Sequence, residues 1–286
     1  MSGAASTLEP WLWTSCGGSL LLGALGLVVE RAGSAVPRLI PTRALAEGLW
    51  WGALARLALP PSIASPFGLA PKIGVVPAAG RAGMEDAAAV IPGPIEPWCV
   101  VLWAAGFAVA ALAAFRSYRS ERLAWPRALA CAPSPRTREA AARAARAVGL
   151  RRTPSVGVFD AAPACVGLRA PWISVPPELE GAARLPDLEV VLLHECAHLA
   201  RRDGLRRAVV VALSCAFWFH PVPHLARRRL DALAEFACDR VAARRATGGV
   251  DACRGALVRA ALAAGAAARR PALGFRPRRS LVAERI

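Results

Sequence analysis

The sequence has few of the residues that disordered and small secreted proteins use most. Only 20% of its 286 residues are charged, whereas 55% are hydrophobic. A disordered chain would be polar and poor in apolar residues, so this composition excludes one. The eight cysteines are dilute and form no C-x-x-C pair, which excludes a disulfide scaffold and a cysteine-type zinc site. We therefore expect a folded chain with reduced thiols.

Lysine is nearly absent, since Lys72 is the only lysine among 36 basic residues. Residues 1–115 carry six basic and six acidic groups, whereas residues 116–286 carry 30 basic and 14 acidic groups. A neutral N-terminal part and a basic C-terminal part predict either nucleic-acid binding or the cytoplasmic side of a membrane protein. The apolar composition of the N-terminal part favours the membrane protein.

Three apolar segments predict transmembrane helices, over residues 11–29, 44–59 and 98–115. The first and third contain no charge, and nineteen helical residues extend roughly 28 Å, close to the ~30 Å of a bilayer core. The second segment contains Glu47 and Arg56, so an interfacial amphipathic helix is its alternative.

Arginines follow the first and third segments, which places these ends in the cytoplasm by the positive-inside rule. Residues 60–97, rich in Pro, Gly and Ala, are then an external loop. The sequence therefore predicts a membrane region over 1–115 and a cytoplasmic domain over 116–286, in a multi-pass protein of the bacterial inner membrane.

The second half of the chain has the pattern of an α+β domain. Ser134 is a predicted N-cap with proline after it. Short apolar runs at 155–159 and 172–175 predict strands. The segment 208–219 is either a buried helix or a hairpin that enters the membrane. Helices are predicted over 135–148, 186–202, 227–245 and 251–268, the second closed by Gly204.

The strongest chemical signal is the run His194-Glu195-Cys196-Ala197-His198. Helical residues four apart share one face, so the two imidazoles can bind one zinc ion while Glu195 acts as general base. The preceding residues 190–193 are apolar, which predicts a buried helix. Burying these polar side chains is costly unless they are paired or ligated, which argues against the alternative of two exposed surface histidines.

A catalytic zinc ion takes three protein ligands and keeps one open position. Glu235 lies on a predicted helix, and Asp239 stands one turn further on the same face. We predict Glu235 as the third ligand and Asp239 as a carboxylate that holds a ligand imidazole through its other nitrogen. The alternative is that both carboxylates only pair with neighbouring arginines such as Arg229.

Several motifs in order resemble the BlaR/MecR-type membrane metallopeptidases, the zinc-protease portions of bacterial beta-lactam sensors. The motifs are similar over about residues 150–286, whereas in the earlier part of the chain only the arrangement of the apolar segments is similar. It implies a gluzincin-like fold and a cytoplasmic peptidase that inactivates a transcriptional repressor after an external signal. Because the sequence ends at Ile286 without a penicillin-binding domain, we do not expect direct beta-lactam sensing. Beside the histidine motif, the matching elements are Ala200-Arg201-Arg202-Asp203, Phe217-Trp218-Phe219-His220-Pro221, Glu235-x-x-Cys238-Asp239, Gly167 with Pro171–Pro176, and Glu284–Ile286.

Four further residues are candidates for a role at the site. His220 is a candidate hydrogen-bond donor to the transition state, while prolines around His220 and His224 argue against a second metal site there. The only tyrosine, Tyr118, lies beside the membrane segment, so we do not expect it to stabilise the oxyanion. Cys196 is expected to be a small buried filler.

The sequence therefore predicts a membrane-embedded endopeptidase with one Zn²⁺ ion. We expect its substrate to be a protein, such as a co-transcribed repressor, lying extended beside the strand 172–175. The expected partners are this substrate and the lipid bilayer, without direct nucleic-acid binding. The alternatives are a prenyl-protein or heat-shock-type membrane zinc protease, a non-catalytic membrane signalling scaffold and a basic nucleic-acid-binding protein.

Overall fold

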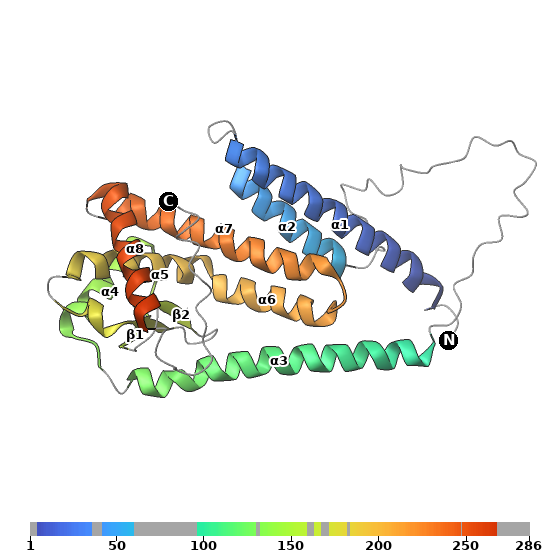
Figure 1. Cartoon of the computed structure of the whole chain (residues 1–286), viewed down its shortest axis with the longest axis horizontal. Coiled ribbons are helices and arrows are strands. Elements are labelled where there is room, and N and C mark those ends of the chain that lie inside the picture. The colour runs from blue at the N-terminus through green and yellow to red at the C-terminus, as the bar shows by residue number, and fades with distance from the viewer. Residues whose placement is uncertain are drawn as a thin grey trace, which may run out of the picture. The chain divides into compact units, whose positions relative to one another are not determined.

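The structure is a computed structural model, and most of its helices and strands are labelled in Figure 1. The chain divides into two compact units, one of residues 1–110 with 212–229 and one of residues 111–211 with 230–286. The residues that the structure describes are 5–35, 42–59, 96–129, 132–158, 163–166, 172–181, 184–246 and 248–267.

In the first unit, α1 (Ala5–Ala35) and α2 (Thr42–Ala58) lie side by side (Figure 1). Their close approach depends on small residues opposite a large one. The Trp50 side chain of α2 is fully buried, and a Cβ atom at Gly23 or Gly26 of α1 would lie 3.3 Å from its ring. Larger residues at these two positions would push the helices apart.

Two helices in the described part of the chain are long and apolar enough to cross a membrane. They cover residues 15–33 of α1 and residues 97–120 of α3 (Pro97–Leu129), close to the predicted segments 11–29 and 98–115. None of the most apolar window of α3 is buried. The predicted segment 44–59 forms α2, whose 17 residues leave its membrane crossing a prediction. Most of the predicted external loop, residues 60–95, lies outside the described residues.

The second unit begins with α4 (Pro135–Ala147), which starts where the sequence predicts. The Ser134 hydroxyl accepts a hydrogen bond from the backbone N–H of Thr137 at 3.2 Å. This bond satisfies one of the N–H groups that the first turn of a helix leaves without a partner. Gly149 follows the helix with a φ of 80°, a conformation that glycine adopts without steric cost.

A three-stranded sheet of β1 (Ser155–Val158), β2 (Ala164–Val166) and β3 (Trp172–Val175) has the order β1-β3-β2. The fully buried β3 pairs in parallel with β1 and antiparallel with β2. The prediction that a substrate lies beside 172–175 is therefore wrong, because both edges of this strand are already paired. The sequence missed β2, since three residues are too few for an alternating pattern.

Helix α5 (Leu185–Arg201) is the centre of the second unit and packs against α4 and α8 (Gly249–Ala267) (Figure 1). The Asp187 carboxylate anchors α8, because it accepts a hydrogen bond from Nε of Arg259 at 2.8 Å and a second bond from Nη2. The largest core side chains around α5 are those of Ile173, Val175, Leu179, Leu188 and Leu192.

Three helices, α3 and the next two described, run through both units of the chain. The segment 208–219 contributes to one of them, α6 (Asp203–Ala216), and its last residues form the turn 217–219 before the following helix. Whether it is a buried helix or a hairpin that enters the membrane stays a prediction. Helix α7 (Pro221–Arg245) starts six residues before the predicted position, 227. Pro221 and Pro223 are compatible with this start because the first turn of a helix does not use its N–H groups.

Candidate metal centre

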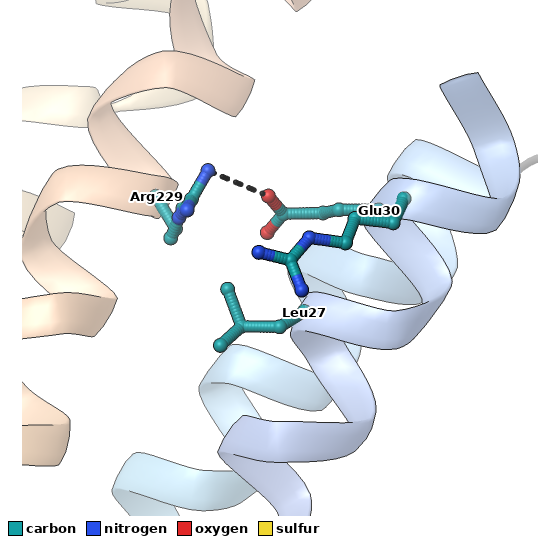
Figure 2. Close-up of a pocket in the computed structure, with 4 residues that line it drawn as sticks. Leu27, Glu30 and Arg229 are labelled. Atoms are coloured by element: carbon teal, nitrogen blue, oxygen red, sulfur yellow. Dashed lines mark hydrogen bonds and ion pairs between the residues drawn. The ribbon is translucent and has the colours of Figure 1, made fainter. Parts of the chain in front are cut away.

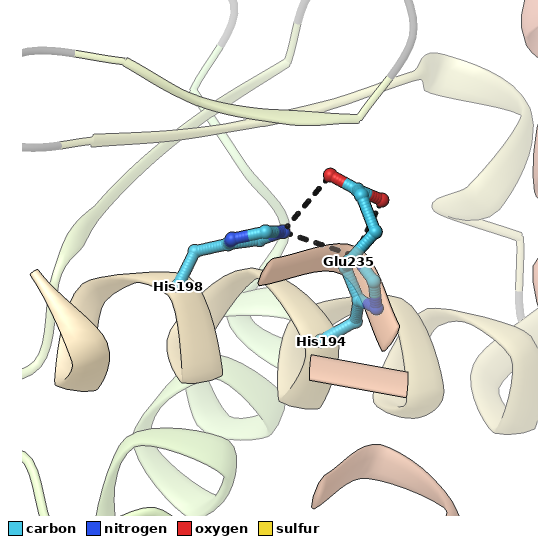
Figure 3. A group of neighbouring side chains, drawn as sticks. All are labelled: His194, His198 and Glu235. Carbon is cyan, nitrogen blue, oxygen red and sulfur yellow. Dashed lines mark hydrogen bonds and ion pairs between the residues drawn. The ribbon is translucent and has the colours of Figure 1, made fainter. Parts of the chain in front are cut away.

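Three side chains from two helices of the second unit converge on one point (Figure 3). His194 and His198 stand one turn apart on α5, and their Nε2 atoms lie 3.2 Å from each other. Glu235 of α7 places Oε2 at 3.6 Å from Nε2 of His194 and Oε1 at 3.5 Å from Nε2 of His198. The structure thus brings together the three residues that the sequence predicts as metal ligands.

A carboxylate faces the other nitrogen of each imidazole. Oδ1 of Asp239 lies 3.0 Å from Nδ1 of His194, a close contact whose alignment is poor for a hydrogen bond. Oδ2 of Asp203 lies 2.9 Å from Nδ1 of His198. Asp239 therefore stands where the sequence predicts a carboxylate behind an imidazole, and Asp203 occupies the same position behind the second histidine.

Asp203 is the residue of this cluster that sequence reasoning missed, and local backbone geometry explains why. Helix α5 ends at Arg202, which adopts the left-handed conformation with a φ of 57°. This turn starts α6 at Asp203 and directs its carboxylate to His198, while Nε of Arg201 holds both carboxylate oxygens at 3.3 Å. The predicted stop signal, Gly204, lies inside α6 instead. A non-glycine residue in this conformation leaves no clear sequence signal.

The electrostatics of the cluster favour positive charge. Burial lowers the pKa of His194, but contacts with Asp239 and Glu235 outweigh it and raise this pKa to about 9. The pKa of His198 is also raised, because Asp203, Cys238 and Glu235 outweigh its burial. Burial acts to raise the pKa of Glu235, but the two histidines bring it far below its usual range.

The donor set fits a metal ion. With the ring protons on Nδ1, where the two aspartates can accept them, both Nε2 atoms and the Glu235 oxygens direct lone pairs at one point. Lone pairs that converge in this way repel one another unless a cation lies between them. Imidazole nitrogens and carboxylate oxygens are ordinary ligands of divalent transition metals. His194, His198 and Glu235 are thus the residues that would hold such an ion.

Glu195 is buried between the two histidines, on the same helix. Burial raises the pKa of its carboxyl group, and the nearby histidines oppose this shift. The backbone of Cys165 in β2 also acts to lower the pKa of this carboxyl group. The sheet thus places a strand beside the glutamate that the sequence predicts as the base.

Thiols surround the cluster. Cys196 is fully buried, as the sequence predicts for a small filler. Cys238 is also buried and lies 3.8 Å from Oδ2 of Asp203, so His198, Asp203 and Cys238 form a second close group that shares one histidine with the first. Burial raises the pKa of the Cys165 thiol to about 12 and that of Cys196 to about 12, so both are held as neutral thiols.

The remaining candidates belong to the first unit. His220 is buried there, and its Nδ1 accepts a hydrogen bond from the backbone N–H of Val222 at 3.3 Å. Its role as a transition-state donor stays a prediction. His224 lies 2.9 Å from the carbonyl oxygen of Trp218, and neither histidine joins a metal-binding group within the described residues.

Comparison with known proteins adds one finding. The family model described as BlaR1 peptidase M56 matches residues 76–248, which is more than half of the chain. The matched range contains every residue of the cluster, from His194 to Asp239, and reaches further towards the N-terminus than the motif resemblance from about residue 150. A search of curated proteins found no match.

Proposed function

The chain belongs to the BlaR1 peptidase M56 family, and from this we propose that it is a zinc-dependent endopeptidase that works at a membrane. The family supports a metallopeptidase of the BlaR1 type. The finer parts of the proposal, namely the metal, the roles of the residues, the substrate and the membrane placement, rest on the geometry and charge described above.

The spacing of the donor groups is the observation that carries the proposal. With bonds of ~2.0–2.2 Å, two ligand atoms on a tetrahedral zinc ion lie about 3.3–3.6 Å apart. The two Nε2 atoms lie 3.2 Å apart, Nε2 of His194 lies 3.6 Å from Oε2 of Glu235, and Nε2 of His198 lies 3.5 Å from Oε1. His194, His198 and Glu235 can therefore each offer one ligand atom to a single zinc ion, and tetrahedral zinc would keep its fourth position for a water molecule or the substrate.

Each residue of the cluster then has a chemical task. Bound zinc supplies Lewis-acid polarisation of the scissile carbonyl and of the attacking water. Glu195 accepts a proton from that water and passes it to the leaving nitrogen. Asp203 and Asp239 fix the tautomer and orientation of the two imidazoles, as carboxylates behind metal-bound histidines generally do.

The sheet offers a place for an extended peptide. Within the described residues, β2 pairs with β3 on one side, and β2 contacts α5, the helix that carries Glu195. We propose that the substrate backbone adds to β2, which would bring its peptide bonds beside the base. This replaces the predicted position beside β3.

We propose that the substrate is a cytoplasmic regulator such as a transcriptional repressor, cleaved after an external signal, because the resemblance to BlaR/MecR-type proteins implies it. The charge asymmetry of the chain supports a multi-pass membrane protein with the metal site on the basic, cytoplasmic side. The family match favours this activity over the prenyl-protein or heat-shock type. A base beside the metal ligands favours it over a non-catalytic scaffold.

Zinc stoichiometry of the detergent-purified protein tests the proposal. Wild type should hold about one zinc ion per chain, and Glu235→Ala should hold clearly less because it removes one of three ligands. Asp231→Ala is the matched control, since Asp231 lies one turn before Glu235 on α7 and pairs with the exposed Arg207 at 3.5 Å.

The three proteins separate the outcomes. Zinc in wild type and in Asp231→Ala, with loss in Glu235→Ala, supports the three-ligand site. Metal-replete wild type without zinc would overturn the peptidase proposal and favour a scaffold. Equal zinc in all three proteins would remove Glu235 from the ligand set.

A further inference from the structure

A pocket of about 240 Å³ in the first unit lies at the end of the apolar stretch of α1 (Figure 2). Its lining is Leu27, Glu30 and Arg31 of α1 and Arg229 of α7. The volume has room for several water molecules, each of which occupies about 30 Å³ in the liquid. Two guanidinium groups and one carboxylate give this lining a net positive charge. The metal centre uses none of these four residues.

The carboxylate of Glu30 already has two partners. Nε1 of the buried Trp50 donates a hydrogen bond to Oε1 at 2.6 Å, and Nη1 of Arg229 lies 3.4 Å from Oε2. This arrangement positions the Arg229 guanidinium at the pocket, as Figure 2 shows. A guanidinium has five N–H donors in a planar fork, so Arg229 can bind a second anion and keep Glu30.

An apolar strip leads along α1 to the same place. Leu21, Leu25 and Val28 are 74%, 48% and 61% exposed, and their spacing of four and three residues puts them on one helix face. Arg31 follows three residues after Val28 and is exposed as well. The candidate membrane span ends at Gly33, so the strip lies in the apolar part of the span and Arg31 lies in its last turn.

We propose that this pocket binds the phosphate of an anionic phospholipid. Arg31 and Arg229 hold the phosphate, and the strip of Leu21, Leu25 and Val28 contacts an acyl chain. Basic pockets between membrane helices bind acidic headgroups in this manner, and a planar guanidinium matches two phosphate oxygens. The inference rests on the membrane placement proposed above but is independent of the peptidase chemistry.

Native mass spectrometry of the full chain, released from nanodiscs, tests the site. The discs contain phosphatidylcholine alone or with phosphatidylglycerol, and a third sample adds inorganic phosphate to the phosphatidylcholine discs. The variants are Arg31→Gln and Arg229→Gln. The matched controls are Arg228→Gln, next to Arg229 on α7, and Arg119→Gln, at the end of the candidate span in α3. Thermal unfolding reports folding in each variant.

Wild type and both controls should retain phosphatidylglycerol in preference to phosphatidylcholine. In Arg31→Gln and in Arg229→Gln, the ratio of retained phosphatidylglycerol to phosphatidylcholine should fall on the order of five-fold. If Arg229→Gln disturbs the fold by leaving Glu30 without its cation, Arg31→Gln decides, because it keeps the Glu30–Arg229 contact.

Equal retention in all variants, or equal losses in pocket and control variants, would overturn the site. Inorganic phosphate bound as well as the lipid would replace it with a site for a free anion. A chain recovered without membranes or detergent would overturn the membrane placement and the lipid site with it. A selective lipid site in a zinc-free protein would leave this inference standing while the proposed function fails.

Discussion

Helices α3 and α5 are both rich in apolar residues, but they place them in opposite surroundings. Trp98, Val101 and Val109 of α3 are 63%, 68% and 70% exposed. Helix α5 buries both of its valines and most of its leucines, and it buries His194 and Glu195 with them. The exposed apolar surface of α3 is stable in hydrocarbon, whereas the buried lone pairs of α5 are stable around a cation. The exposed surface of α3 thus favours the proposed bilayer, and the buried polar groups of α5 favour the proposed metal ion.

The largest expected effect comes from the polar side of α5. Glu195→Gln removes the base and leaves the three ligands, so hydrolysis of a labelled unfolded protein should fall about 100- to 10,000-fold while zinc content stays constant. Glu189→Gln is the control, because Glu189 is on the same helix and pairs with Arg143 at the surface. Equal rates for both variants would show that Glu195 is not the base.

Matched leucine truncations compare the two helices directly. Leu192→Ala in α5 should cost about 2–5 kcal/mol of unfolding free energy, since Leu192 is fully buried and truncation leaves a cavity. Leu102→Ala in α3, 55% exposed, should change it by about 0.5 kcal/mol or less. Denaturant titration in detergent measures both. A larger loss for Leu102→Ala would mean that α3 is a protein-buried helix.

A charge in the middle of α3 tests whether this helix lies in the hydrocarbon core of a bilayer. Val109→Arg should cost about 2.5–3.5 kcal/mol of membrane insertion, because an arginine at the centre of a span is poorly solvated. The fraction of chain that integrates into membranes measures this cost. Ser117→Arg, near the end of the span, is the control and should insert normally. Unchanged insertion of Val109→Arg would argue against a span at α3.

The residue behind His198 should have a smaller effect than the base. Asp203→Asn keeps the shape of the side chain but weakens its hold on Nδ1, so zinc affinity or activity should fall about 10- to 100-fold. Asp231→Asn on α7 should change neither zinc affinity nor activity. Competition with a chelator of known affinity measures the zinc affinity. Unchanged zinc affinity in Asp203→Asn would show that Asp203 does not support the metal site.

The smallest effect concerns acid stability at the N-terminus of α5. The hydrogen bond from Arg259 holds the pKa of Asp187 below its usual value. The contribution of ionised Asp187 to the free energy of unfolding is therefore complete above the unfolded-state pKa, about 3.9. This contribution is lost as the pH falls through the lower pKa of the folded state. Thermal melts should show Asp187→Asn less stable than wild type near neutral pH, and the difference should shrink below about pH 4. A constant difference would contradict this.

The part of the metal site that the sequence predicts is the part set by helix geometry. His194, Glu195 and His198 share one helix, so a regular spacing fixes their relation. Glu235 and Asp239 come from a distant helix, and the motif order together with the ligand number of zinc pointed to them. Asp203 depends on the left-handed turn at Arg202, which residue type does not reveal.

The sheet shows the same limit. The strands at 155–159 and 172–175 are apolar and β-branched, and they form β1 and β3 close to the predicted ends. Strand order depends on contacts between segments far apart in the chain. The three residues of β2 pair with one edge of β3, where a substrate could otherwise lie, and no local pattern indicates them.

Helix α7 has a mechanical consequence. It is continuous from Pro221 to Arg245, and it carries both the Arg229 partner of Glu30 and the Glu235 of the metal cluster. Six residues of helix separate them by about 9 Å, a distance over which a helix is a stiff rod. Metal sites tolerate errors of only about 0.2 Å in ligand position. If the proposed metal ion is bound, a shift of α7 along its axis by a fraction of an ångström would therefore change the distance between Glu235 and the ion.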